Sequence, residues 1–134
     1  VLCSLLFVIS GMAQNRRYYC EMIGRQIGFD KDKKVAFDFG TTVPRDIWGD
    51  VADKLQLVDA SGKVIWFKSM VEALNFMTAK GWIFQQAYSS HIENVEFSHF
   101  LLYKEAGSVG EAKEGLMTKE DWDQTHHSEP KKRK

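Results

Sequence analysis

Residues that could bind a metal ion gather near the C-terminus of this 134-residue chain. Carboxylates and imidazoles are ordinary zinc ligands, but a zinc site needs ligands that a folded scaffold holds in a fixed geometry. The segment that carries these residues is polar, and polar chain ends are commonly mobile. We therefore assign no metal-binding residue, although the residue types fit: Asp121, Asp123, His126, His127 and Glu129.

Acid–base or nucleophilic catalysis would require histidine, serine, cysteine or carboxylate side chains within reach of one another. His91 and His99 lie beside and within the last predicted strand. His99 lies on the same strand face as Phe97 and Leu101, so we predict a hydrogen-bonded histidine in the core rather than a general base. No serine lies in a G-x-S-x-G turn, and Cys20 has no histidine near it in the sequence. The sequence thus favours a protein that is not an enzyme, and we assign no catalytic residue.

One short segment suggests nucleotide chemistry. Asp38-Phe39-Gly40-Thr41-Thr42 is similar to the phosphate-loop opening of actin-like ATPases, and its first three residues to the magnesium-binding element of protein kinases. Both families need several further motifs that this sequence lacks, and no G-x-x-x-x-G-K-[ST] pattern occurs. We interpret the segment as a strand followed by a turn, and we predict no cofactor.

The clearest structural signal is a helix that begins after Ser69 and ends at Gly81. Ser69 is a good N-cap, and Glu72 follows it at the spacing of a capping box. Gly81 fits the left-handed stop after a helix. One face of the helix is an apolar stripe formed by Met70, Ala73, Leu74 and Met77. Phe76 projects away from this stripe, either as a partner contact or as a packing residue for a neighbouring strand.

Segments with a period of two surround this helix and predict an α+β fold. We expect an antiparallel sheet of about five or six strands with one main helix packed on one face. The predicted strands span 18–27, 35–40, 54–59, 63–67, 82–88 and 95–104. The alternation groups side chains by face: Tyr18, Cys20 and Met22 against Tyr19, Glu21 and Ile23; Val35, Phe37 and Phe39 pointing inward against Ala36 and Asp38 pointing outward; and Trp82, Phe84 and Tyr88 together.

The two ends of the chain differ from this central part. Residues 1–13 are apolar and uncharged and end in the small residues Gly11 and Ala13, which is typical of a partial signal peptide. We expect an exported protein, periplasmic or secreted, with an α+β domain at 14–105. Residues 106–134 read as a polar C-terminal tail with a short helical turn capped by Thr118. Lys131-Lys132-Arg133-Lys134 resembles a nuclear localisation patch, but we interpret it as a solvated end.

Charge and cysteine content limit the classes of partner. The chain has 18 basic and 18 acidic residues, and this zero net charge argues against a nucleic-acid partner. Removal of residues 1–13 would leave one cysteine, Cys20, and no stable membrane anchor. We expect a protein or cell-envelope component as partner, or a homodimer formed through sheet edges.

The helix and its neighbouring strands resemble a short domain of unknown function in small exported bacterial proteins. In that domain a leucine-rich helix ends in Gly-Trp and the chain returns as paired strands. The matching segments are Tyr18–Glu21, Phe37–Gly40, Ser69–Met77, Gly81-Trp82 and Leu101–Lys104. The resemblance implies an α+β fold and carries no activity, so it assigns no functional residue.

These observations favour a non-catalytic exported binding or protein-interaction module that uses an aromatic sheet face or an edge strand. The alternative is a small-ligand-binding domain or enzyme with a pocket between helix and sheet. The candidate surface residues are Phe76, Trp48, Trp66 and His91.

Overall fold

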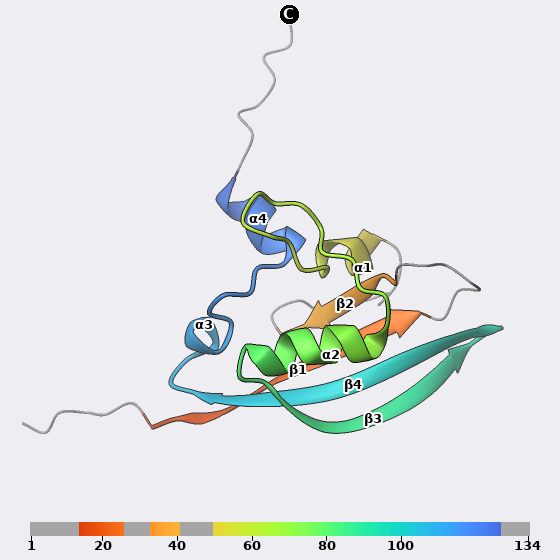
Figure 1. The fold of residues 1–134 in the computed structure, drawn as a ribbon, viewed down its shortest axis with the longest axis horizontal. Coiled ribbons are helices and arrows are strands. Elements are labelled where there is room, and N and C mark those ends of the chain that lie inside the picture. Colours follow the sequence, from red (N-terminus) through yellow and green to blue (C-terminus); the bar gives the residue numbers. More distant parts are fainter. Residues whose placement is uncertain (1–13, 26–32, 41–49, 127–134) are drawn as a thin grey trace, which may run out of the picture.

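The computed structural model describes residues 14–25, 33–40 and 50–126. Within these ranges the chain forms one antiparallel sheet of four strands in the order β2-β1-β4-β3, together with four helices (Figure 1). The α+β class is confirmed, but the described residues form four strands instead of the expected five or six, and three shorter helices accompany the one main helix that was expected. The strands are β1 (Arg16–Arg25), β2 (Val35–Asp38), β3 (Ile83–Ile92) and β4 (Val95–Ala106), and the helices are α1 (Asp50–Lys54), α2 (Met70–Ala79), α3 (Val109–Ala112) and α4 (Lys119–Thr125).

The missing strands are those predicted at 54–59 and 63–67. Lys54 instead ends α1, and the two segments meet at a single bridge between Val58 and Val64. The turn between them forms as expected, because the Asp59 carboxylate accepts hydrogen bonds from the Ser61 amide at 2.9 Å and the Lys63 amide at 3.0 Å. A tight turn with one bridge holds the chain in place without forming a regular strand pair.

The helix α2 occupies the position that its sequence predicts. The Ser69 hydroxyl accepts a hydrogen bond from the Glu72 amide at 3.1 Å, and Gly81 ends the helix with a φ of 90°. The predicted capping box is wrong in its second half, because the Glu72 carboxylate accepts from the Lys68 amide at 2.7 Å. The Glu72 carboxylate thus accepts from the backbone one residue before the N-cap Ser69.

The face of the sheet that α2 covers, here called the helix face, holds the larger part of the core. Cys20, Met22, Phe37 and Leu102 pack there with Met77 of α2. Figure 1 shows α2 lying alongside the strands of the sheet. The predicted alternation of Tyr18, Cys20 and Met22 with Tyr19, Glu21 and Ile23 is confirmed by the pairing of β1 with β4.

Gly24 of β1 leaves room for the side chain of Met70 at the start of α2. A Cβ atom at Gly24 would lie 2.3 Å from the Met70 sulfur atom, so a larger residue there would require the Met70 side chain to move.

The other face of the sheet, here called the open face, is covered only near β2 among the described residues. There Ile23, Ala36 and Phe97 pack with Ala52 and Leu55, the latter directly after α1. The expectation that Ala36 points outward is therefore wrong, since α1 buries it completely. Further toward β3, the open face carries exposed side chains.

A β-bulge in β3 changes which residues share a face. The register shifts between Phe84 and Gln86, so Phe84 pairs with Leu102 on the helix face, whereas Tyr88 pairs with His99 on the open face. One extra residue in a strand inverts the alternation that follows it. The prediction that Trp82, Phe84 and Tyr88 share a face is wrong for this reason.

The segment expected to be a polar tail packs on the domain as far as the structure describes it. β4 ends at Ala106, and Ala112 and Leu116 lie in the core. The predicted cap Thr118 is confirmed: its hydroxyl accepts from the Asp121 amide at 3.2 Å, while the Asp121 carboxylate accepts from the Thr118 amide at 3.0 Å.

The carboxylate of Asp121 has a second partner in Lys113, whose ammonium lies 2.8 Å away. Burial raises the pKa of Asp121, but the hydrogen bonds from Lys113 and Thr118 outweigh burial and hold it below its usual value. The charged carboxylate therefore joins α4 to the residues after α3.

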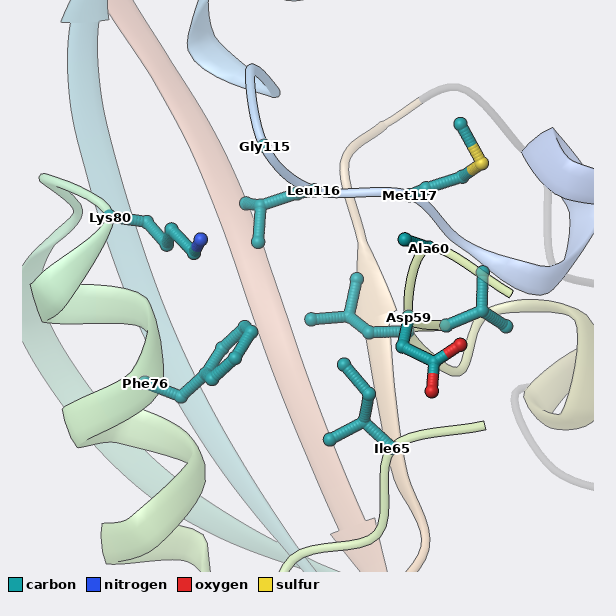
Figure 2. A pocket seen from close by; sticks show the side chains of 10 residues that line it. Asp59, Ala60, Ile65, Phe76, Lys80, Gly115, Leu116 and Met117 are labelled. Atoms are coloured by element: carbon teal, nitrogen blue, oxygen red, sulfur yellow. The ribbon is translucent and has the colours of Figure 1, made fainter. Parts of the chain in front are cut away.

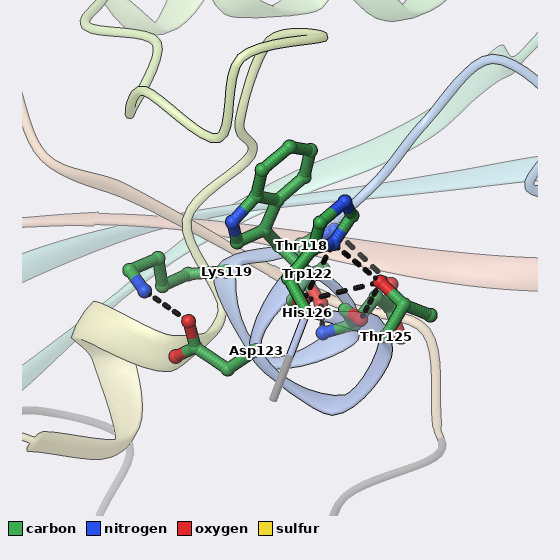
Figure 3. A network of polar contacts seen from close by, with 7 residues as sticks. Thr118, Lys119, Trp122, Asp123, Thr125 and His126 are labelled. Carbon is green, nitrogen blue, oxygen red and sulfur yellow. Dashed lines mark hydrogen bonds and ion pairs between the residues drawn. The ribbon is translucent and has the colours of Figure 1, made fainter. Parts of the chain in front are cut away.

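Around α4, the Trp122 ring stacks on His126 with ring centroids 3.6 Å apart, and Lys119 pairs with Asp123 (Figure 3). The His126 ring also contacts the Trp122 carbonyl oxygen at 3.1 Å. The described structure ends at His126, so His127, Glu129 and the basic residues 131–134 lie outside it.

Candidate functional site

The open face gathers large exposed apolar side chains from three strands. Tyr19 on β1 and Ile83, Tyr88 and Ile92 on β3 are each 45–62% exposed, and the strand registers place all four on this face. Leu101 and Tyr103 of β4 lie between them and are partly exposed. Large exposed apolar patches on one face are typical of interaction sites, whereas single exposed residues are ordinary.

One end of the open face is an aromatic pair with a charged rim. The rings of Tyr19 and Tyr103 lie 6.2 Å apart, and the Arg17 guanidinium lies 4.3 Å above the Tyr103 ring. Arg17 also approaches the Glu105 carboxylate at 3.6 Å. The guanidinium thus stacks on a tyrosine in the manner of a cation–π contact.

The centre of the open face holds four connected polar side chains, here called the Glu21 network: Glu21, Tyr88, Ser90 and His99. The Tyr88 hydroxyl donates to Glu21, and His99 Nδ1 lies 2.6 Å from the same carboxylate oxygen, Glu21 Oε1. His99 Nε2 lies 2.7 Å from Ser90 Oγ. The Tyr88 ring stacks on the His99 ring at 4.4 Å, so His99 is hydrogen-bonded through both nitrogens and covered on one side.

Burial and charge act on the phenol of this network. Burial and Glu21 together raise the pKa of Tyr88 to about 12: burial is the larger cause, and Glu21 acts through its hydrogen bond and its charge. Tyr88 therefore remains a hydrogen-bond donor to the carboxylate throughout the physiological pH range.

The hydrogen bonds define the tautomer of a neutral His99. An ionised carboxylate only accepts hydrogen bonds, so His99 Nδ1 must carry the proton that faces Glu21. Nε2 then has a free lone pair and accepts from the Ser90 hydroxyl. A hydroxyl, an imidazole and a carboxylate in this order are the chemical parts of an activated nucleophile.

The structure confirms the prediction of a hydrogen-bonded histidine in the core, since His99 is 7% exposed. Sequence reasoning missed its partners. Tyr88 and Ser90 lie near His99 through the β3–β4 hairpin, and the hairpin register could have indicated them. Glu21 reaches His99 only through the pairing of β1 with β4, which leaves no local signal in the sequence.

A separate pocket of about 220 Å³ lies between α2, the 57–65 turn and the segment 115–117 (Figure 2). Phe76 lines it from α2 and Lys80 from the position directly after α2, and the Lys80 ammonium lies 5.6 Å from the Phe76 ring centre. Apolar residues form much of the wall, while Asp59 is held by its own turn. The lining consists of Leu57, Val58, Asp59, Ala60, Ile65, Phe76, Lys80, Gly115, Leu116 and Met117.

The four candidate surface residues do not form one site. Phe76 is partly buried and packs edge-on against Phe67 at 5.6 Å, which matches the packing alternative. Trp66 is half exposed on the segment before α2, and His91 is exposed on the helix face of β3, opposite Glu96. Trp48 lies outside the described residues.

Two classes of site find no support within residues 14–25, 33–40 and 50–126. No helix in these ranges is long and apolar enough to cross a bilayer. In the same part of the chain, no three His, Cys, Asp or Glu side chains are grouped so that they could hold a metal ion.

Comparison with known proteins gives no relative for this chain. No protein-family model matches it, and neither a curated protein nor a solved structure is significantly similar to it.

Proposed function

We propose that this protein is a non-catalytic interaction module that binds an extended protein strand along the free edge of β3. The observation that carries the proposal is the chemistry of this edge. β3 is ten residues long, forms one end of the strand order, and contains no Lys, Arg, Asp, Glu or Pro. Edge strands of monomeric proteins are usually protected by charged residues or proline, and an unprotected edge can accept another strand.

The exposed residues of the open face extend this binding surface. Ile83, Tyr88 and Ile92 lie on β3 itself, so a strand added beside it would continue the face on which they lie. Because β3 carries no formal charge apart from its histidine, an uncharged strand with alternating apolar residues fits best. β3 of a second copy is such a strand, and we propose the homodimer formed by antiparallel β3 pairing as the occupant.

The oligomeric state tests this proposal. Sedimentation equilibrium is expected to show a dimer whose population rises with protein concentration. Gln86→Lys should weaken the dimer at least about tenfold, because each copy would add one ammonium group to the shared β3–β3 interface, where the two like charges repel. The matched control is Gln124→Lys on α4, which adds the same charge away from β3. A chain that remains monomeric at millimolar concentration, or two variants that dissociate alike, would contradict β3 pairing.

We propose that the protein works outside the cytoplasm, because residues 1–13 have the composition of a signal peptide. The resemblance to small exported bacterial proteins supports the same location. Cell fractionation of the full chain, with mass determination of the new N-terminus, tests this proposal. A protein retained in the cytoplasm with residues 1–13 intact would contradict it.

A second candidate function is the binding of a small ligand in the pocket of Figure 2. Lys80 would attract a carboxylate, and the side chains of Leu57, Phe76 and Leu116 offer an apolar wall. A thermal-shift screen of small aliphatic and aromatic carboxylates tests it, with Lys80→Ala as the variant that should lose the shift. No stabilisation at millimolar carboxylate would argue against this function.

A further inference from the structure

We propose that Ser90 is an activated nucleophile and a site of stoichiometric acylation by small, reactive aryl esters. His99 serves as the general base and Glu21 as the positioning residue. This inference is independent of strand binding at β3, because it rests on the Glu21 network.

The geometry supplies each part of an activated serine. Ser90 Oγ and His99 Nε2 are 2.7 Å apart, and His99 Nδ1 and Glu21 Oε1 are 2.6 Å apart. Both distances are within the reach required of a nucleophile, its base and the group that orients the base. The Glu21 carboxylate fixes the proton on Nδ1, which leaves Nε2 free to remove the Ser90 proton.

The network is held rigidly enough to act as a unit. His99 is 7% exposed, and the Tyr88 ring lies parallel to its imidazole at an angle of 6°. Tyr88 also donates to the carboxylate oxygen that faces His99. The base is therefore fixed by a stacked ring and the carboxylate, while Ser90 itself remains partly exposed.

The surroundings of Ser90 select the class of reagent. On β3 the same face carries Tyr88 on one side of Ser90 and Ile92 on the other, both exposed. An aryl leaving group or a short acyl chain can lie on these two side chains. Ser90 is partly exposed on the open face and does not line the pocket of Figure 2, so we expect an oxyanion formed there to face solvent. We expect slow acylation of one serine rather than rapid turnover.

The reaction balances without any further component. Ser90 Oγ attacks the ester carbonyl carbon while His99 Nε2 takes the hydroxyl proton. The tetrahedral intermediate then collapses, the bond from carbon to the aryl oxygen breaks, and the proton passes from Nε2 to the leaving aryl oxide. The products are an O-acyl Ser90, a neutral His99 and the free phenol.

The test is acetylation of the full chain by p-nitrophenyl acetate at neutral pH, followed by peptide fragmentation. Ser89 is the matched control within the same molecule, because it is the adjacent serine on the helix face. General base catalysis contributes about a hundredfold or more, so Ser90 should be acetylated about a hundredfold faster than Ser89. Ser90→Ala should lose the fast phase of nitrophenol release, and Ser89→Ala should retain it.

The role of Glu21 has its own readout in the Glu21→Gln variant. The wild-type imidazole of His99 should show a protonated Nδ1 and an unprotonated Nε2 by nitrogen NMR. Glu21→Gln should slow acetylation of Ser90 at least about tenfold and alter this signature. Equal acetylation of Ser89 and Ser90, modification confined to lysines, or an unaltered rate in Glu21→Gln would each overturn the proposal.

Discussion

Alanine in place of Gly62 should destabilise the fold in two ways, through backbone strain and through a collision with Trp122. Comparison with Gly40, where only the strain applies, separates the two effects. Gly62 has a φ of 81°, and a Cβ there would lie 2.3 Å from Trp122 Cε2 and 2.5 Å from its Nε1. Alanine at this position therefore suffers both a left-handed backbone and a collision with the indole. Gly40 has a nearly equal φ of 77°, but a Cβ there meets nothing within 4 Å in the described structure.

The two glycines give the size of each effect. Gly40→Ala should lower the free energy of unfolding by about 1 kcal/mol, the cost of a left-handed non-glycine residue. Gly62→Ala carries the same cost and must also displace Trp122, which adds about 1 to 3 kcal/mol, as overpacking does elsewhere. Urea unfolding followed by circular dichroism measures both variants on the same scale.

A double-mutant comparison isolates the collision. In a chain that already carries Trp122→Ala, the cost of Gly62→Ala should fall to that of Gly40→Ala. Equal destabilisation by Gly62→Ala and Gly40→Ala in the otherwise unchanged chain would refute the reasoning, since the indole would then not rest on the 59–63 turn.

Four further predictions concern other parts of the chain. Glu93, with a φ of 55° at the first residue of the β3–β4 turn, should be replaceable by glycine with a gain of about 1 kcal/mol in urea unfolding; a loss would contradict the assigned backbone. Burial raises the pKa of the Cys20 thiol well above its usual value, so its peptide should react with a thiol reagent only after unfolding, as mass spectrometry can measure. The pKa of Tyr88, raised to about 12 by burial and by Glu21, should fall part of the way toward its usual 10.0 in Glu21→Gln, which retains the burial; ultraviolet titration against Tyr88→Phe detects this fall. Because the folded pKa is raised, the hydrogen bond to Glu21 stabilises the fold below pH 10 and is lost as pH rises toward 12. Asp121→Ala should lower the free energy of unfolding by about 1 kcal/mol at pH 7, because it removes the carboxylate that accepts from the Thr118 amide. Since the folded pKa of Asp121 is depressed, the difference from wild type should vanish as pH falls below the usual 3.8. A difference that persists in acid would contradict the ionic role.

The parts of the fold that could be predicted from the sequence depend on residues close together in the chain. Ser69, Gly81 and Thr118 act on neighbouring backbone groups, so their types and spacing are sufficient to indicate the ends of helices. The strands predicted at 82–88 and 95–104 are likewise present because both segments carry a period of two, although β3 extends to Ile92.

The parts that could not be predicted depend on contacts between distant segments. α1 covers Ala36 and turns a position expected at the surface into a core position. The bulge near Gln86 places Phe84 and Tyr88 on opposite faces, and no residue type at that point marks the shift. The Glu21 network needs the β1–β4 pairing to bring Glu21 to His99, so the sequence indicated a hydrogen-bonded His99 but not its carboxylate.

The place of β1 in the sheet has a consequence for the order in which the chain folds. β1 is the first described strand, yet its main neighbour is β4, the last strand of the sheet, and β2 is bonded to the sheet through β1 alone. Closing so long a loop carries a high entropic cost, and folding slows as contacting residues lie further apart in sequence. The β3–β4 hairpin is local and should form early, as a template to which β1 and then β2 add. Until β4 is complete, β1 and β2 have no sheet to join, so a chain shortened before residue 95 should lose the entire sheet rather than two of its strands.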